Sequence, residues 1–316
     1  MGAPIGQSWA VWVILLLAVA PFAHANPKVA YREMGEGFRV GVKIRVLDLA
    51  DGSVTQFVDD WLHEGASSWG PRGDSLVASA ERDRASDIFR ARVGTAHRTW
   101  LTEHPASDGD PAWSPEGRRV AFASYRDGGW QIYVMDIDGT NLRRVTEDPL
   151  SSTDPSWSPD GNSLVYRYFD NVGLSVVRSL DLGTGVTRSL TPDDNFVNAP
   201  ALSWDGKHVA YVTHEPNSRE WHVEVMTADG RDKWLVTENA GRLNSGPAWT
   251  PDGDVSFLSS ANGANNIAVT GLQGGDVEIL TDSRTYKEHL AWYNPRWFPV
   301  QALAALQPKL WGRLKR

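Results

Sequence analysis

One sequence pattern returns six times along the chain of 316 residues, at intervals of 43 to 47 residues. In each copy a short run with strand character reaches Trp, or Leu in one copy, and a turn that contains Pro or Gly follows. The complete form of the pattern is Pro155-Ser156-Trp157-Ser158-Pro159-Asp160-Gly161. The residues at the repeat position are Trp69, Trp113, Trp157, Leu202, Trp249 and Trp292. A repeat of this length with strand content is typical of a β-propeller, whose blades bury their faces only against each other.

Each copy continues as a series of short strands. A run of alternating or β-branched residues after the turn predicts a second strand. A third strand leads into a turn with Gly, such as Asp136-Ile137-Asp138-Gly139. A short last strand ends in a Leu-Thr or Val-Thr pair, for example Val145-Thr146. The sequence therefore predicts an all-β fold built from four-stranded antiparallel blades.

The sixth blade is divided between the two ends of the chain. Residues 289–295 supply only an innermost strand, and residues 28–58 supply the three strands that this blade lacks. We therefore predict a six-bladed propeller closed by a composite N- and C-terminal blade, because closure removes an exposed sheet edge. The predicted propeller spans 26–295, and its complete blades lie at about 66–102, 108–146, 153–191, 198–237 and 245–281.

The repeat resembles that of the TolB-type, WD-like propeller family. The resemblance rests on the Trp-Ser-Pro-Asp-Gly turn, the Val-Ala-Phe strand at 120–122 and the Ile-Tyr-Val-Met-Asp run at 132–136, which Asp138-Gly139 follows. It covers about residues 28–295 and implies an exported six-bladed propeller. The Tol-system protein carries an α/β domain before its propeller, and only a few residues precede the first strand here. We therefore do not expect this chain to be that whole protein.

The N-terminal residues are typical of an export signal. Trp9 to Ala20 form a twelve-residue apolar run, and Ala23-His24-Ala25 is a small-x-small cleavage pattern. We expect residues 1–25 to be a signal peptide and the mature protein to be periplasmic or secreted, with an uncleaved anchor as the alternative. The chain has no Cys, which excludes disulfides and thiol chemistry. Its net charge of −8 argues against nucleic acid as a partner.

The sequence lacks the common catalytic motifs. It contains no G-x-S-x-G elbow, no H-E-x-x-H pair and no G-x-x-x-x-G-K-[ST] loop. His208 and His214 are six residues apart on one predicted strand and would face the same side, but a metal site would require ligands from other blades. We predict no catalytic residue, no cofactor and no metal ligand. The sequence favours a non-enzymatic protein without deciding against an enzyme.

The aromatic residues allow two interpretations. The five repeat Trp residues either form a stacking platform for a ligand or pack neighbouring blades together, and their fixed position in the repeat favours packing. We therefore predict structural roles for Trp69, Trp113, Trp157, Trp249 and Trp292. Trp204 lies outside the repeat register. It is a candidate for an exposed, functional loop position.

The candidate binding site is one mouth of the central channel, where propellers hold their ligands. The residues four and three positions before each repeat Trp or Leu are predicted to form a ring there. They are Gly65/Ala66, Gly109/Asp110, Thr153/Asp154, Asn198/Ala199, Ser245/Gly246 and Glu288/His289. The candidate ligand-binding residues are Asp110, Asp154, Asn198, Glu288 and His289. The alternative is that these residues only cap turns.

Residues 296–316 form a basic tail with five basic residues and no acidic one. Leu303, Leu306, Leu310 and Leu314 follow helical spacing, which Pro308 interrupts. The candidate interaction residues are Lys309, Trp311, Arg313, Lys315 and Arg316. The tail either contacts an anionic membrane, docks on a partner, folds back on the acidic propeller or remains a disordered end.

These observations together favour one function and leave two alternatives. The favoured function is a non-enzymatic, monomeric, exported TolB-like propeller that acts as a protein- or peptide-binding scaffold in the bacterial envelope. The first alternative is a propeller enzyme, a polysaccharide lyase or hydrolase with its site at the channel mouth. The second is a propeller that binds a small ligand and is directed to the envelope by its basic tail.

Overall fold

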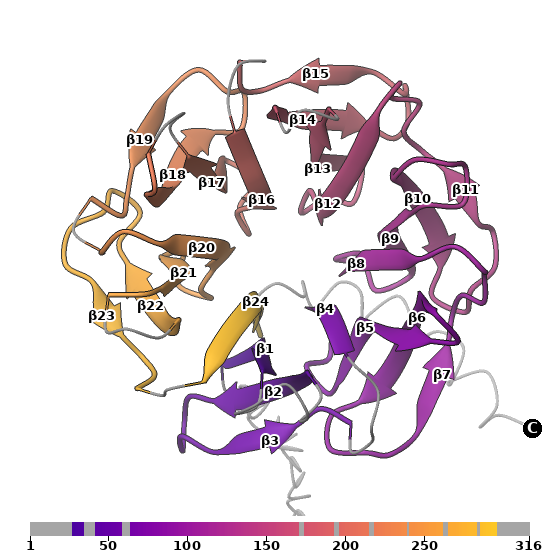
Figure 1. The fold of residues 1–316 in the computed structure, drawn as a ribbon, viewed down its shortest axis with the longest axis horizontal. Helices are drawn as coiled ribbons and strands as arrows, with labels where there is room; N and C mark the ends of the chain where they lie inside the picture. The colour runs from indigo at the N-terminus through magenta and orange to yellow at the C-terminus, as the bar shows by residue number, and fades with distance from the viewer. Residues whose placement is uncertain are drawn as a thin grey trace, which may run out of the picture.

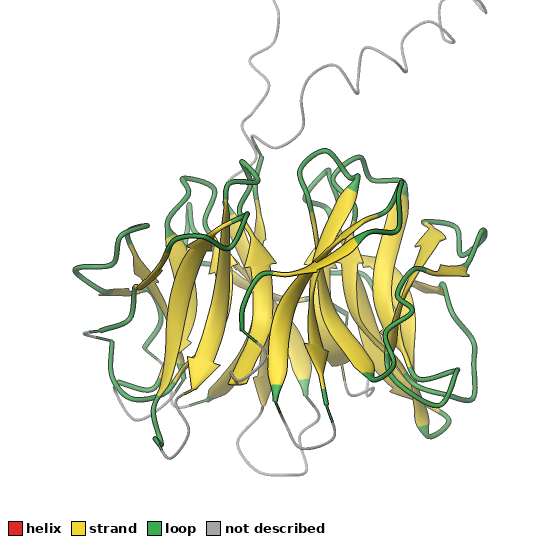
Figure 2. Ribbon diagram, turned by 90° about the horizontal axis from the view of Figure 1, so that it is seen from above, coloured by secondary structure: helices red, strands yellow, loops and turns green. Residues whose placement is uncertain are grey.

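The strands of this protein form a ring of six sheets (Figure 1). The computed structural model describes residues 27–34, 42–58, 64–170, 174–192, 196–214, 218–238, 240–261, 265–282 and 285–295. Within these ranges there are 24 strands and no helix, so no described helix is long and apolar enough to cross a membrane. Each sheet has four antiparallel strands, and Figure 2 shows them running between two faces of the ring that carry the loops. The predicted all-β propeller of six blades is confirmed.

The five continuous blades follow one another along the chain, each from its innermost to its outermost strand. The first two blades are β4 (Glu64–Trp69), β5 (Ser75–Arg82), β6 (Ala85–Arg92), β7 (Arg98–Trp100), and β8 (Asp108–Trp113), β9 (Arg119–Ser124), β10 (Gln131–Asp136), β11 (Arg143–Arg144). The third and fourth are β12 (Ser151–Trp157), β13 (Ser163–Phe169), β14 (Ser175–Asp181), β15 (Thr187–Ser189), and β16 (Phe196–Leu202), β17 (His208–His214), β18 (Trp221–Thr227), β19 (Lys233–Leu235). The fifth is β20 (Asn244–Trp249), β21 (Val255–Ser259), β22 (Asn266–Thr270), β23 (Glu278–Ile279).

The sixth blade joins the two ends of the chain, as predicted. Its strands are β24 (Tyr286–Tyr293), β1 (Lys28–Met34), β2 (Lys43–Asp48) and β3 (Val54–Gln56), in that spatial order. β24 pairs with β1 along its length, from Lys28 opposite Tyr293 to Met34 opposite Tyr286. The ring is therefore closed by hydrogen bonds between segments that are more than 250 residues apart in sequence.

The last strand of each continuous blade ends two residues before the Thr of the Leu-Thr or Val-Thr pair. The physical reason is the Thr hydroxyl. In the second blade, Val145 donates its N–H to the Ile132 carbonyl, and the Ile132 N–H donates to Thr146 Oγ1 at 2.9 Å. The hydroxyl thus takes the place of a backbone carbonyl, and the chain is free to leave the sheet. The same bond, at 2.9–3.0 Å, involves Thr102, Thr191, Thr237 and Thr281.

The hydrophobic core lies between neighbouring blades rather than inside one blade. Val77 and Ile88 of the first blade, for example, pack against Phe122, Tyr133 and Met135 of the second. Each blade therefore exposes apolar faces unless both neighbours are present, which is the arrangement expected of a repeat that cannot bury its faces alone.

A buried carboxyl group joins the composite blade to the first blade. Glu64, at the start of β4, is 1% exposed, and its Oε2 accepts a hydrogen bond of 2.6 Å from the Ile44 N–H of β2. Burial raises the pKa of Glu64 to about 7, while the bond from Ile44 and the charges of Lys43 and Arg45 oppose this rise. The native state consequently binds a proton that the unfolded chain releases at lower pH.

We expect the free energy of unfolding to fall by up to about 3 kcal/mol as pH rises from about 4.5 to 8 because of Glu64. Glu64→Gln removes the ionisation but keeps an oxygen for Ile44, so this variant should be more stable than the wild type at pH 8 and similar to it at pH 5. Urea unfolding at both pH values measures the difference. Asp108→Asn is the matched control, because Asp108 holds the corresponding position and pairs with Arg126 at 3.1 Å. It should destabilise at pH 8, and a Glu64→Gln variant that does the same would contradict the assignment.

Candidate functional site

The innermost strand of every blade contains a β-bulge at one register position. Pairing with the second strand shifts there in all six blades. In five blades the residue three positions before the repeat Trp or Leu has a left-handed backbone. These residues and their φ values in degrees are Asp110 (48), Asp154 (54), Ala199 (48), Gly246 (56) and His289 (49). A bulge turns an extra residue away from the regular alternation of the strand, and here the extra residues line the channel.

A proline follows the bulge residue in four of the six blades, at Pro111, Pro155, Pro200 and Pro247. Proline has no N–H to donate, so it fits a position at which the ladder of hydrogen bonds is interrupted. It also disfavours the right-handed helical conformation for the residue before it. The X-Pro pair is therefore compatible with the bulge in these four blades, whereas the first and sixth blades form the bulge without it.

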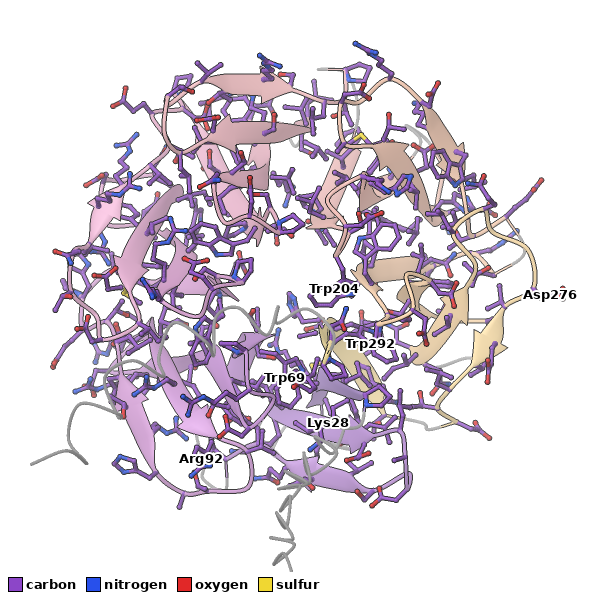
Figure 3. All side chains as sticks on the ribbon, turned by 180° about the vertical axis from the view of Figure 1, so that it is seen from behind. Lys28, Trp69, Arg92, Trp204, Asp276 and Trp292 are labelled. Atoms are coloured by element: carbon purple, nitrogen blue, oxygen red, sulfur yellow. The ribbon has the colours of Figure 1, made fainter. Side chains whose placement is uncertain are left out.

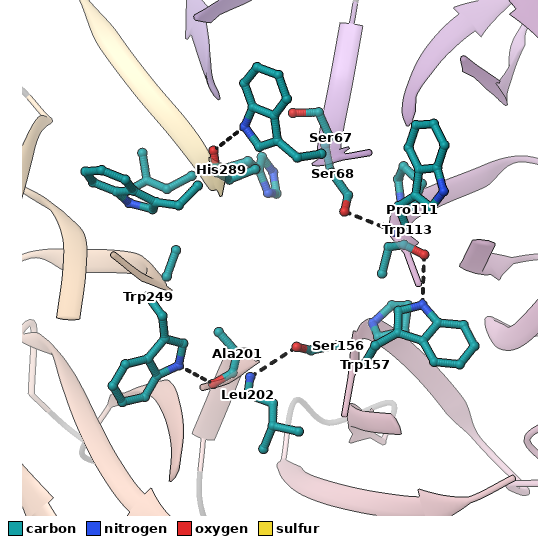
Figure 4. Close-up of a pocket in the computed structure, with 18 of the residues that line it drawn as sticks. Ser67, Ser68, Pro111, Trp113, Ser156, Trp157, Ala201, Leu202, Trp249 and His289 are labelled. Carbon is teal, nitrogen blue, oxygen red and sulfur yellow. Dashed lines mark hydrogen bonds between the residues drawn. The ribbon is translucent and has the colours of Figure 1, made fainter. Parts of the chain in front are cut away.

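The six bulge residues line a single cavity of about 240 Å³ along the channel axis (Figure 4). The cavity extends from this ring to the turns after the innermost strands, where Ser114, Pro115 and Asn294 line it. Its walls are mostly Pro, Ala and Trp side chains. Among the described residues that line it, Asp110 and Asp154 are the only acidic side chains, and none is Lys or Arg. The cavity is thus mostly apolar, with two carboxylates at the same position along the channel, that of the bulge ring.

The two carboxylates belong to adjacent blades and influence each other. The Asp110 carboxylate accepts a hydrogen bond from the Asp154 backbone N–H. Burial, and next the negative charge of Asp154, raise the pKa of Asp110 well above its ordinary value, while that bond and Arg167 oppose the rise. Like charges in a confined site do not ionise independently. Asp110 therefore keeps a proton at a pH where an ordinary aspartate has lost it, and a cation in the cavity would displace this proton.

His289 belongs to the composite blade and forms part of the same ring. Burial lowers the pKa of His289, and Arg32 lowers it further, whereas Asp154 and Glu288 act in the opposite direction. The imidazole is therefore neutral at neutral pH. It supplies a hydrogen-bonding group to the channel without adding a positive charge beside the aspartates.

Two of the predicted site residues lie outside the cavity lining. Glu288 pairs with Arg32 of β1 at 2.7 Å. Asn198 Oδ1 accepts hydrogen bonds from Arg167 at 3.3 Å and from the Ala199 N–H at 2.9 Å. Both residues stand one position before a bulge residue, and each is bonded to an arginine instead of lining the cavity. The structure thus brings Asp110, Asp154 and His289 together in the channel. Glu288 and Asn198 instead bond to the neighbouring Arg32 and Arg167.

Arg167 is a residue of this region that sequence reasoning missed. It lies on β13, the second strand of its blade, and its charge acts on both Asp110 and Asp154. Burial lowers the pKa of Arg167, and the two aspartates counteract this effect. Nothing in the repeat marks the position, because an Arg in the middle of an inner strand has no special spacing relative to the Trp.

The repeat tryptophans surround the cavity and connect one blade to the next. Trp157, which is 4% exposed, donates its indole N–H to the Ala112 carbonyl of the preceding blade at 2.9 Å. Trp69 and Trp249 make the same contact, at 2.9 Å, with Ala291 and Ala201 (Figure 4). These three indoles are only 4–8% exposed, and they pack and form hydrogen bonds between neighbouring blades.

The remaining blade contacts use serine. Ser68 Oγ accepts from the Trp113 backbone N–H at 3.0 Å, and Ser156 Oγ accepts from Leu202 at 3.1 Å. Trp292 donates to Ser256 Oγ at 2.7 Å. Trp113 differs from the other repeat tryptophans, because it is half-buried and its indole nitrogen has no hydrogen-bond partner within the described part of the chain.

Trp204 lies in the turn after β16 and lines the cavity, so its functional role stays a prediction, but the expected exposure is wrong. It is half-buried, and its indole N–H donates to the carbonyls of Trp249 and Thr250 at 3.0 and 2.9 Å. Figure 3 shows Trp204, Trp292 and Trp69 on the channel side of the ring, whereas Arg92 and Asp276 lie at its outer rim. Trp204 thus packs between the fourth, fifth and sixth blades.

The two histidines of β17 have separate surroundings. His208 contacts the rings of Trp234 and Trp249, and His214 lies against Trp221 with ring centroids 4.7 Å apart. Among the residues that the structure describes, no three His, Cys, Asp or Glu side chains are grouped as metal ligands. The candidate tail residues Lys309, Trp311, Arg313, Lys315 and Arg316, and the expected signal peptide at 1–25, lie outside the described residues.

The architecture is that of a closed six-bladed propeller with Trp-containing repeats around a channel. The sequence matches the family described as TolB beta propeller domain over residues 17–242. This match spans more than half of the chain, and the protein belongs to the TolB β-propeller domain family. No curated protein matches the sequence.

Several solved structures share the fold. TolB from Acinetobacter baumannii is 20% identical, with a TM-score of 0.74 over 84% of this chain and 66% of that one, so the chain spans just under two thirds of its length. The putative TolB from Agrobacterium tumefaciens is 19% identical, with a TM-score of 0.67 over 85% and 99% of the two chains. An oligogalacturonate lyase in complex with manganese is 16% identical, with a TM-score of 0.57 over 76% and 72%. Identities this low show a common fold and no more.

Proposed function

We propose that this protein is an exported, non-enzymatic propeller whose channel binds an extended segment of a protein partner in the cell envelope. The observation that carries the proposal is the single cavity to which all six blades contribute a bulge residue. At about 240 Å³ it is smaller than the roughly 300–1,000 Å³ typical of small-molecule sites. It therefore suits one or two side chains of a longer segment better than a whole small ligand.

The chemistry of the cavity supports a polypeptide ligand. Pro, Ala and Trp surfaces contact aliphatic or aromatic side chains, and Asp110, Asp154 and His289 offer hydrogen-bond acceptors and a donor at one level. Aromatic anchors in a confined pocket are typical of the sites that dominate protein recognition. The envelope location rests on the export pattern at the N-terminus and on the family membership.

Photo-crosslinking in the native cells tests this function. With p-benzoylphenylalanine in place of Ala66, which lines the cavity, we expect a crosslinked polypeptide. Its yield should fall roughly tenfold when Asp110→Asn and Asp154→Asn are combined, since one lost charge-assisted contact costs about 1.4 kcal/mol or more. Mass spectrometry of the crosslinked peptide identifies the bound segment.

Two matched variants serve as controls. Asp276, at the outer rim, carries the same crosslinker away from the channel, and Glu288→Gln changes a carboxylate outside the cavity lining. Equal crosslinking from Ala66 and Asp276, or equal loss with Glu288→Gln and with the aspartate pair, would place the binding surface elsewhere.

A further inference from the structure

We propose that the protein's own basic tail, residues 296–316, occupies the channel as an intramolecular ligand and competes there with the partner segment. The inference rests on the proposed function, because it assigns a regulation to the same cavity. Three features of the described residues support it. They are the point at which the tail is attached, the residues that line the cavity, and the protonation of Asp110 in it.

The tail is attached at the rim of the cavity. β24 ends at Tyr293, the next residue, Asn294, lines the cavity, and Pro295 is the last described residue before the tail. The tail has 21 residues and spans up to about 70 Å when extended. The innermost strands have six to eight residues, or about 20–27 Å. The tail is therefore long enough to turn back at the rim and enter the channel.

The tail and the cavity are complementary in chemistry. The only charged side chains among the described lining residues are Asp110 and Asp154, and the walls are apolar. The tail has no acidic residue. Its last eight positions contain four basic and three large apolar side chains, in the order Lys309-Leu310-Trp311-Gly312-Arg313-Leu314-Lys315-Arg316. A Lys or Arg head group can pair with the aspartates while its aliphatic stem lies along the Pro and Ala wall.

At neutral pH the cavity lining carries acidic side chains and no cationic one among the described residues, so it favours a positively charged ligand. His289 is neutral there, and Arg32 is paired with Glu288 at 2.7 Å. Arg167, which is bonded to Asn198, offsets part of the charge of both aspartates but does not line the cavity. A proton on Asp110 and a cation in the cavity compete for the same carboxylates. Binding of a basic segment should therefore tighten as pH rises from 6 to 8.

Tethering makes even weak binding effective. A segment attached at the cavity rim has an effective concentration in the millimolar range. If the free segment binds with a Kd of about 100 μM, the tethered tail fills most channels and weakens binding of an external segment by roughly tenfold. The tail would then set a threshold that a partner must exceed.

Fluorescence anisotropy with a labelled synthetic peptide of residues 305–316 tests the inference. The protein ending at Pro295 should bind the peptide at least about tenfold more tightly than the full chain does. Combining Asp110→Asn with Asp154→Asn in the shortened protein should weaken binding by tenfold or more, whereas Asp276→Asn at the outer rim should leave it unchanged. A full chain with Lys309→Glu, Arg313→Glu, Lys315→Glu and Arg316→Glu should bind the peptide as the shortened protein does. Equal melting temperatures confirm that these proteins are folded.

The other outcomes separate the two proposals. Equal peptide affinity of the full and shortened proteins overturns tail occupancy but leaves the channel site intact. No peptide binding by either, together with a crosslink at Ala66, overturns the tail proposal only. No binding and no crosslink overturn both. Flotation with phosphatidylglycerol vesicles covers the membrane alternative: if only the full chain floats and vesicles do not change its peptide affinity, the tail is a membrane element and the inference fails.

Discussion

A protein that ends at Asp282, and so lacks β24, is expected to lose its folded monomeric state. Three contacts vanish together: β1 loses its paired neighbour, Trp69 loses the Ala291 carbonyl to which its indole donates, and the Trp292 and Tyr293 rings leave the cores on both sides. We expect the melting temperature to fall by at least about 10 °C, or the cooperative transition to disappear. The exposed edge of β1 should also promote association.

Circular dichroism on heating and size-exclusion chromatography with light scattering measure both effects. The control is the protein that ends at Pro295, which keeps the composite blade complete and should melt within about 3 °C of the full chain, the difference being the stabilisation that the bound tail contributes. A protein ending at Asp282 that stays monomeric with an unchanged melting temperature would show that the ring does not depend on this seam.

Trp157→Ala is expected to lower the free energy of unfolding by about 3–5 kcal/mol, the usual cost of truncating a buried large aromatic side chain. The indole is 4% exposed, packs in the core between the second and third blades and donates to Ala112 at 2.9 Å. Arg119 also lies over its ring, with 4.6 Å from the guanidinium carbon to the ring centroid. Truncation therefore leaves a cavity and an unpaired carbonyl, and the Arg119 guanidinium loses its ring contact while it keeps its bonds to Glu116 and Gly161.

Trp113→Ala is the matched control for this variant, because the two residues hold the same repeat position in adjacent blades. Trp113 is half-buried and its indole N–H makes no hydrogen bond within the described residues, so its loss should cost only about 1–2 kcal/mol. Urea unfolding followed by circular dichroism gives both values. Equal costs would mean that position in the repeat, and not burial and hydrogen bonding, determines what each tryptophan contributes.

The fold was predictable because each blade repeats the same turn and the same pattern of strand residues. The Trp-to-Gly turn, the alternating strands and the missing strands at the chain ends were sufficient to predict six blades and the composite closure. The ends of the last strands were not predictable in the same way. A Thr at a strand end looks like a strand residue, and only the structure shows that its hydroxyl replaces a carbonyl and stops the pairing.

The candidate site was predictable only in part. Counting back from the Trp placed Asp110, Asp154 and His289 near the channel, but it did not separate them from Asn198 and Glu288, one residue earlier. Simple alternation along a strand breaks down at a bulge, so the sequence alone left both positions open. The X-Pro pairs at Asp110 and Asp154 mark the bulge in retrospect. Arg167 had no such mark.

The left-handed bulges also restrict how the channel can change. A side chain with a branched or bulky β-carbon pays roughly 1–2 kcal/mol for that conformation, whereas Gly, Asn and Asp adopt it readily. Five ring positions have this backbone, so the residues tolerated there are few before any ligand is considered. The small or polar residues at most of these positions are therefore partly a consequence of the backbone conformation. Variants that exchange aspartate for a large aliphatic residue should be limited by folding, and specificity is more freely altered at Ala66, which has no positive φ.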